Sequence, residues 1–115
     1  MEDCLFCKIA NSEISCDFVY EDEDIVAFKD IHPRAPVHLL LLPKKHIASL
    51  AETTEADIAL LGKINFVAQK LAEQFNIDQS GYRLLTNCRG DSGQEVPHIH
   101  YHLIGGHFLG AFTEE

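Results

Sequence analysis

The spacing of apolar side chains along the chain predicts five β-strands. Each predicted strand is a short run of aliphatic, β-branched or aromatic residues that lies close to Gly, Pro, Asn or Asp. The first two runs flank the acidic stretch 21–24 and therefore predict a β-hairpin with a polar turn. The third run is almost continuously apolar, which indicates a central strand that is buried on both faces. The five segments are 18–20, 25–28, 37–42, 82–88 and 96–104.

Apolar residues at steps of three and four predict one long helix over 54–75. Thr54 and Asp57 have the spacing of a capping box at its start. The expected apolar stripe consists of Ile58, Leu61, Ile64, Ala68, Leu71 and Phe75. A second, short helix is expected over 4–12. Together these elements predict a single α+β domain over 1–115, in which the long helix covers an antiparallel five-stranded sheet.

Composition and charge narrow the class of protein. A chain of 115 residues that is 46% hydrophobic suits one compact domain. Its net charge of −9 argues against an extended nucleic-acid partner, although a small phosphorylated substrate still fits a local site. No apolar run approaches the roughly 18 residues of a membrane span, and no secretory signal is visible. We therefore expect a cytoplasmic protein with no membrane partner.

Three of the seven histidines alternate in the last predicted strand, namely His98, His100 and His102. Because side chains alternate across a strand, all three imidazoles should lie on one face. Such a row can bind a metal ion or supply a nucleophilic ring nitrogen. Spacing alone ranks these two roles about equally.

The loop before this strand offers groups that could hold a phosphate. Gly90 and Gly93 allow backbone N–H groups to approach an anion closely. Asn87 and Gln94 add neutral side-chain donors. A phosphoryl group held here could be attacked by an imidazole to give a phosphohistidine intermediate.

The chain has four cysteines, of which Cys4 and Cys7 form the only pair with the spacing of metal ligands. Without a secretion signal, disulfides are the weaker interpretation. The pair could also be two buried thiols. Cys16 and Cys88 are interpreted as structural.

The segment His98-Ile99-His100-Tyr101-His102-Leu103-Ile104 resembles the histidine triad signature of the HIT superfamily. The resemblance covers essentially the whole chain in order and is similar to the Hint branch. The tail after Gly105-Gly106 lacks the Trp-Pro-Pro ending of the eukaryotic proteins and resembles a bacterial-type member. The other matching stretches are 28–40, 43–47, 81–87 and 93–96.

The resemblance implies a purine nucleoside phosphoramidase or acyl-nucleotidase that releases a nucleoside monophosphate. By motif match, His100 would attack the α-phosphorus and form a nucleotidyl-histidine intermediate. His98 and His102 would flank the phosphate, and His38 would support proton transfer. Family members are usually homodimers that meet through the long helix and a sheet edge.

The resemblance also implies a nucleotide-binding set. Asn87, Gln94 and the backbone of Gly93 would hold phosphate oxygens, and Asp30 would accept the ribose hydroxyls. Glu95 stands where the best-known eukaryotic members have Ser. An apolar purine slot would be lined by Phe6, Ile9, Phe28, Ile31 and Leu40.

Some relatives of this superfamily bind structural zinc through a similar pair of cysteines and two histidines. The matching residues here are Cys4, Cys7, His46 and His98. No organic cofactor is expected. Two other functions stay open: a dinucleoside polyphosphate hydrolase of the Fhit branch, and a nucleotide-binding or protein-interaction module with little catalysis.

Overall fold

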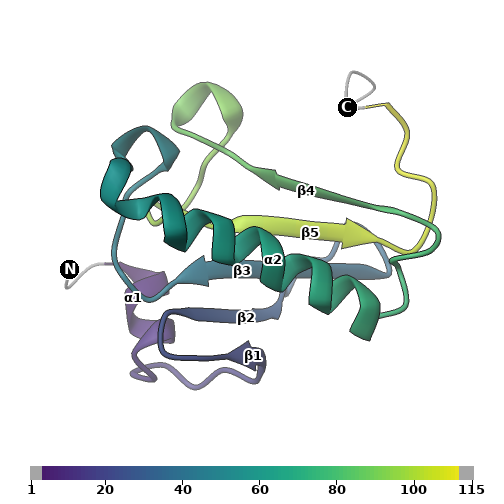
Figure 1. Ribbon diagram of the computed structural model, residues 1–115, viewed down its shortest axis with the longest axis horizontal. Coiled ribbons are helices and arrows are strands. Elements are labelled where there is room, and N and C mark those ends of the chain that lie inside the picture. Colours follow the sequence, from purple (N-terminus) through teal and green to yellow (C-terminus); the bar gives the residue numbers. More distant parts are fainter. Residues whose placement is uncertain (1–3, 112–115) are drawn as a thin grey trace.

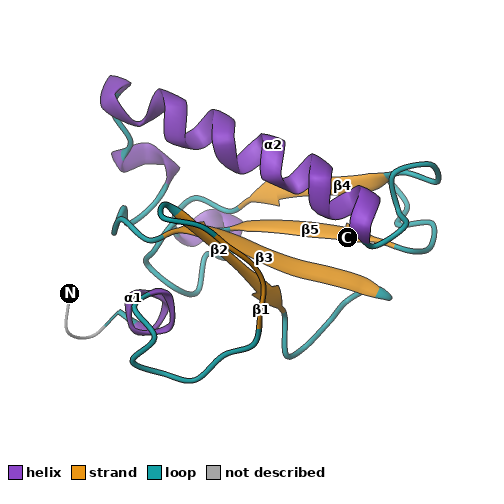
Figure 2. Ribbon diagram, turned by 60° about the horizontal axis from the view of Figure 1, so that its bottom comes forward, coloured by secondary structure: helices purple, strands orange, loops and turns teal. Residues whose placement is uncertain are grey.

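The computed structural model describes residues 4–111, which form one antiparallel sheet with helices on both faces (Figures 1 and 2). Within them the strand order is β1-β2-β3-β5-β4, so the predicted five-stranded α+β fold is confirmed. The strand β3 lies at the centre, as its apolar sequence predicts. The bounds are β1 Phe18–Glu21, β2 Ile25–Lys29, β3 Val37–Pro43, β4 Tyr82–Thr86 and β5 Tyr101–Gly105.

The two helices lie on opposite faces of the sheet (Figure 2). The long helix α2 (Ile58–Gln74) covers one face, and the short helix α1 (Leu5–Ala10) lies against the other. Alternation along β3 supplies both cores, because successive side chains point to opposite faces. Leu39 and Leu41 pack in the cluster under α2, whereas Leu40 and Leu42 pack in the cluster with α1.

The start of α2 confirms the capping box, but its apolar stripe differs from the prediction. Thr54 and Asp57 cap each other's backbone groups, and a single 3₁₀ turn, Glu55–Asp57, precedes the helix. Ile58 was expected in the stripe and is 65% exposed. It precedes Ile64 by six residues, which places it about 120° away around the helix. The buried residues are Ile64, Val67, Ala68, Leu71 and Ala72.

The acidic stretch forms the expected hairpin turn and also ties the hairpin to α2. The carboxylate of Asp22 accepts hydrogen bonds from the backbone N–H groups of Asp24 (2.8 Å) and Ile25 (2.9 Å). The ammonium of Lys63, on α2, pairs with Asp22 at 3.0 Å and with Asp24 at 2.9 Å. No helix in the described part of the chain is long and apolar enough to cross a membrane.

The histidine strand begins later than predicted, at Tyr101 instead of residue 96. Pro97 has no N–H for a sheet ladder, and the N–H of Ile99 donates to the carbonyl of Ile47 at 2.6 Å instead. The hydroxyl of Thr86 donates to the carbonyl of His100 at 2.7 Å, just where the pairing of β4 and β5 ends. His98 and His100 therefore lie in an extended segment before β5.

Candidate active site

The three imidazoles lie on one side of the sheet, although only His102 belongs to β5. The intervening side chains of Ile99, Tyr101 and Leu103 pack in the cluster under α2. On the other side, the ring of Phe6 lies edge-on to His98 and His100, with centroids 6.2 and 4.9 Å apart. The alternation predicted for this segment is thus present even before the sheet pairing begins.

His98 belongs to a group of four side chains with metal-ligand atoms, Cys4, Cys7, His46 and His98, which we call the Cys/His cluster. All four ligand atoms lie within 4.8 Å of one another. The sulfur-to-Nδ1 distances are 3.3 Å for Cys4–His98, 3.4 Å for Cys7–His98 and 3.2 Å for Cys7–His46. A tetrahedral zinc ion separates sulfur and nitrogen ligands by roughly 3.5 Å. The geometry therefore fits such an ion after small shifts.

The protonation of His98 also suits a metal ligand. Its Nε2 lies 2.8 Å from the carbonyl oxygen of Pro43, an acceptor, so Nε2 carries the hydrogen and Nδ1 presents its lone pair to the sulfurs. Burial lowers the pKa of His98 to about 4, so the ring is neutral near pH 7. Burial, followed by the Cys4 thiol, raises the pKa of Cys7 to about 11 in the metal-free protein.

His100 has the opposite tautomer. Its Nδ1 lies 2.8 Å from the carbonyl oxygen of His98 and must donate a hydrogen to it. In the neutral form of the ring, Nε2 carries a lone pair, and no hydrogen bond occupies this atom within residues 4–111. His100 as a whole is only 7% exposed. A neutral imidazole with a fixed orientation and a free nitrogen is what nucleophilic attack requires.

Asp30, His38 and His102 form a second group, which we call the relay cluster. The backbone N–H of Arg34 donates to His38 Nδ1 at 3.1 Å, so the hydrogen of neutral His38 is on Nε2. That Nε2–H faces His102 Nδ1 at 2.9 Å and Asp30 Oδ2 at 3.4 Å. His102 accepts at Nδ1 and consequently carries its own hydrogen on Nε2.

The relay cluster has three potential metal-ligand atoms, but its hydrogen bonds are those expected for proton transfer. Its three ligand atoms also lie within 4.8 Å of one another. A metal at His38 Nε2 would force the hydrogen onto Nδ1 and break the bond from the Arg34 N–H. Burial lowers the pKa of His38, and burial followed by the neighbouring His100 lowers that of His102 to about 4. Both rings are therefore neutral near pH 7.

The predicted phosphate donors fall into two kinds. The side chain of Asn87 makes no hydrogen bond with any described residue and is free to bind a ligand. Gln94, in contrast, donates to the carbonyls of Ala48 (2.7 Å) and Val96 (2.9 Å). The N–H of Gly93 donates to the carbonyl of Gly90 at 3.0 Å. Phosphate binding by Gln94 and Gly93 stays a prediction, and here both hold their own loop together.

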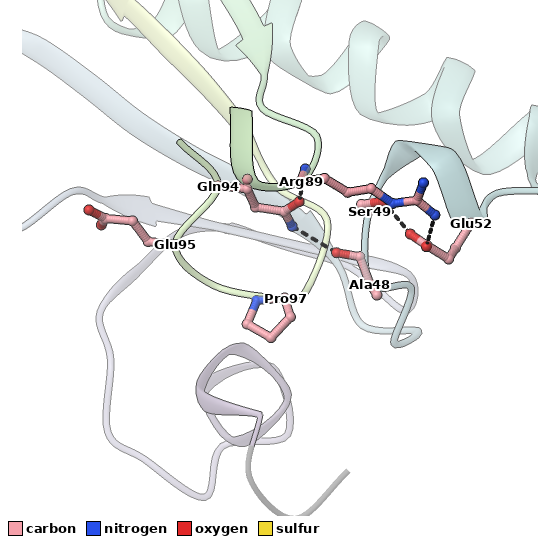
Figure 3. Close-up of a pocket in the computed structure, with 8 residues that line it drawn as sticks. Ala48, Ser49, Glu52, Arg89, Gln94, Glu95 and Pro97 are labelled. Carbon is pink, nitrogen blue, oxygen red and sulfur yellow. Dashed lines mark hydrogen bonds and ion pairs between the residues drawn. The ribbon is translucent and has the colours of Figure 1, made fainter. Parts of the chain in front are cut away.

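A cavity of about 420 Å³ lies between this loop and the segment 48–52 (Figure 3). Five of its eight lining residues are polar or charged, and Glu95 points away from the other labelled side chains. None of the histidines lines it. The lining residues are Ala48, Ser49, Glu52, Arg89, Gly90, Gln94, Glu95 and Pro97.

The residues predicted for the purine slot are mostly together. Phe6, Ile9, Phe28 and Leu40 pack in the apolar cluster with α1, and the rings of Phe6 and Phe28 are 6.0 Å apart. Ile31 stands apart from them and is 85% exposed. Asp30, predicted to bind ribose, faces His38 with one oxygen and accepts from the N–H of His32 with the other.

Sequence reasoning missed the groups that fix the tautomers. These groups are the N–H of Arg34 and the carbonyls of Pro43 and His98. All three are backbone atoms, which no side-chain pattern can reveal. The loop prolines Pro33 and Pro36 on either side of Arg34 are the only hint, because they indicate a fixed turn there.

The fold and site define a class of α+β domain in which a row of histidines is divided, with His98 in the Cys/His cluster and His102 in the relay cluster. The model of the HIT domain matches residues 11–109, and the chain belongs to the HIT family.

Characterised and solved relatives match along nearly the whole chain. A purine nucleoside phosphoramidase of Escherichia coli K12 is 44% identical over 95% of this chain and 92% of its own length. A HIT family hydrolase from Legionella pneumophila has 49% identity and a TM-score of 0.92, covering 94% of this chain and 96% of its own. A histidine triad protein from Clostridium difficile has 44% identity and a TM-score of 0.94, covering 97% of both chains.

Proposed function

We propose that the protein hydrolyses purine nucleoside phosphoramidates, with His100 as the nucleophile, and releases a nucleoside monophosphate. The observation that carries this proposal is the unoccupied Nε2 of His100, whose ring the carbonyl of His98 orients beside a second imidazole, that of His102. The ring centroids of these two histidines are 5.2 Å apart. The similarity to a purine nucleoside phosphoramidase supports the substrate class.

Attack by His100 Nε2 forms a nitrogen–phosphorus bond and breaks the bond to the leaving amine, which must gain a proton. A bound phosphate favours protonation of the relay cluster, because a nearby negative charge stabilises the imidazolium. His102 then delivers the proton from Nε2. In the second step water attacks phosphorus, its proton goes to His102 Nε2, and the bond to His100 breaks.

His38 orients His102 for this proton transfer. In the resting, neutral pair its Nε2–H donates to His102 Nδ1, which leaves His102 Nε2 as the atom that faces outward to exchange a proton. The carboxylate of Asp30, 3.4 Å from His38, offsets the positive charge of the protonated pair. We infer that Asn87 binds the phosphate, since its amide is free.

A side-by-side assay tests this function against its two alternatives. We expect an adenosine phosphoramidate to be hydrolysed with a kcat/KM at least about tenfold above that of a diadenosine polyphosphate. The reverse order would indicate an enzyme of the Fhit type. Tight binding of adenosine monophosphate with no turnover of either compound would indicate a binding module and would overturn the proposal.

We also propose that the Cys/His cluster holds a structural zinc ion through Cys4, Cys7, His46 and His98. Four protein ligands complete a tetrahedral site, which leaves no open position for a substrate. Such an ion would join α1 to the segment before β5. Its role would be to hold His98, whose carbonyl orients His100.

We further propose that the protein is a homodimer formed through α2 and the outer edge of β4. Among the described residues β4 has a strand partner on one side only, and unpaired edges favour association. On α2, Ile58 and Phe66 are 65% and 56% exposed. Light scattering should report a dimer for the wild type and a monomer for Phe66→Glu, and a monomeric wild type would contradict the proposal.

A further inference from the structure

Gln94 uses both of its amide hydrogens inside the protein. Its Nε2 donates to the carbonyls of Ala48 at 2.7 Å and Val96 at 2.9 Å, and its Oε1 accepts from the backbone N–H of Arg89 at 2.6 Å (Figure 3). A primary amide has two hydrogens to donate. No donor is left for a phosphate oxygen unless one of these bonds is broken.

These hydrogen bonds connect the two ends of the loop 89–97. Arg89 begins the loop and Val96 ends it, so the single side chain of Gln94 joins the two ends. Arg89 has a φ of 65°, which is uncommon for a residue other than glycine. Such a conformation persists only where surrounding contacts hold it. The bond from its N–H to Gln94 is one of those contacts, and the ion pair of Arg89 with Glu52 is another.

The partner of Gln94 outside the loop is a segment that also supports the histidines. Three consecutive residues of this segment each hold a different part of the site. His46 belongs to the Cys/His cluster, the carbonyl of Ile47 accepts from the N–H of Ile99 at 2.6 Å, and the carbonyl of Ala48 accepts from Gln94. The segment thus connects the candidate metal site, the row of histidines and the loop.

We propose that Gln94 is a positioning residue, which locks the loop 89–97 onto the segment 46–48 instead of binding phosphate itself. The loop is thereby fixed before substrate arrives, and Asn87, two residues before Arg89, is held in place to bind the phosphate. This inference deepens the proposed function and rests on it for the identity of the bound phosphate.

Amide hydrogen exchange in the ligand-free protein tests the lock directly. We expect Gln94→Met, which keeps the side-chain volume, to speed exchange of the Arg89 and Ile99 amides by about tenfold or more. The matched control is Gln79→Met, because Gln79 is exposed and bonds only to Asp78. Wild-type exchange in Gln94→Met, combined with affinity for adenosine monophosphate weakened about tenfold, would assign Gln94 to the phosphate and overturn the proposal.

Side-chain amide spectra of the wild type give a second test that needs no folded variant. On addition of adenosine monophosphate, we expect the NH₂ resonances of Asn87 to shift strongly and those of Gln94 to stay nearly unchanged. A large shift at Gln94 with none at Asn87 would contradict the proposal. Neither measurement requires turnover, so failure of the hydrolase assay and failure of this inference are distinguishable.

Discussion

The Cys/His cluster and the relay cluster are built from the same kind of side chain and differ in the atom that the backbone leaves free. In the first, the carbonyl of Pro43 takes the hydrogen of His98 Nε2, and Nδ1 faces two sulfurs. In the second, the N–H of Arg34 occupies His38 Nδ1, and the hydrogens of both rings lie on Nε2. Hydrogen bonds to backbone groups therefore determine which imidazole is suited to metal binding and which is suited to proton transfer.

His100 lies between the two clusters and is connected to both. The carbonyl of His98 fixes its Nδ1–H, and its ring lies beside that of His102. We therefore expect changes in the Cys/His cluster to affect mainly stability, and changes around His100 and the relay cluster to affect mainly rate.

The largest effect should come from removing the nucleophile. We expect His100→Gln to lower turnover of an adenosine phosphoramidate by at least about 10³-fold. The Kd for adenosine monophosphate should stay within about threefold of the wild type, since other groups hold the phosphate. His107→Gln is the control, because His107 is exposed. Substantial turnover by His100→Gln would remove the distinction between His100 and its neighbours.

A change in the Cys/His cluster should have its main effect on folding. We expect Cys7→Ser to lose bound zinc and to lower the free energy of unfolding by roughly 3 kcal/mol. Cys16→Ser, outside the cluster, should keep both. Metal analysis of protein purified without chelators or metal-affinity steps checks this, and a zinc stoichiometry near zero in the wild type would refute the assignment.

A change in the relay cluster should slow the reaction without unfolding the protein. We expect His38→Gln to lower kcat by about 10²-fold with KM nearly unchanged, because proton transfer is lost while binding is kept. Steady-state kinetics check this. If this variant lost bound zinc to the same extent as it lost kcat, the two clusters would not be functionally separate.

The smallest effect concerns pH and stability. Burial lowers the pKa of His102 from 6.5 to about 4, so the unfolded chain binds a proton between these values that the folded protein does not. The contribution of neutral His102 to the free energy of unfolding is therefore complete above about pH 6.5 and is lost as the pH falls towards 4. His102→Asn should flatten the decline by about 1 kcal/mol, after allowance for the partly exposed ring. Denaturation curves check this, and an unchanged slope would contradict it.

Much of the fold could be predicted from the sequence because local patterns agreed with the packing. The apolar run of β3 predicted a central strand, and Thr54 with Asp57 predicted the helix start. The prediction for Ile58 was wrong because two successive steps of three residues, from Ile58 to Leu61 and from Leu61 to Ile64, add up to a rotation of about 120° around the helix. The start of the histidine strand was wrong because Ile99 bonds to Ile47, a partner that is distant in sequence.

The candidate site was predictable as a set of residues but not as a set of roles. Spacing and resemblance brought together Cys4, Cys7, His46 and His98, and the structure places their ligand atoms within 4.8 Å. The division of the histidine row depends on backbone acceptors, which a sequence does not display. The same limit applies to Gln94, whose partners are carbonyl oxygens.

The proposed hydrolysis requires His100 to form a covalent intermediate with the nucleotide. Intact-protein mass spectrometry can detect this intermediate after brief incubation with an adenosine phosphoramidate and an alkaline quench, which preserves phosphohistidine. We expect one adenylyl group on the wild-type chain, mapped to His100 and absent from His100→Gln. An adenylyl group on His98 or His102, or none while substrate is being consumed, would contradict the proposal.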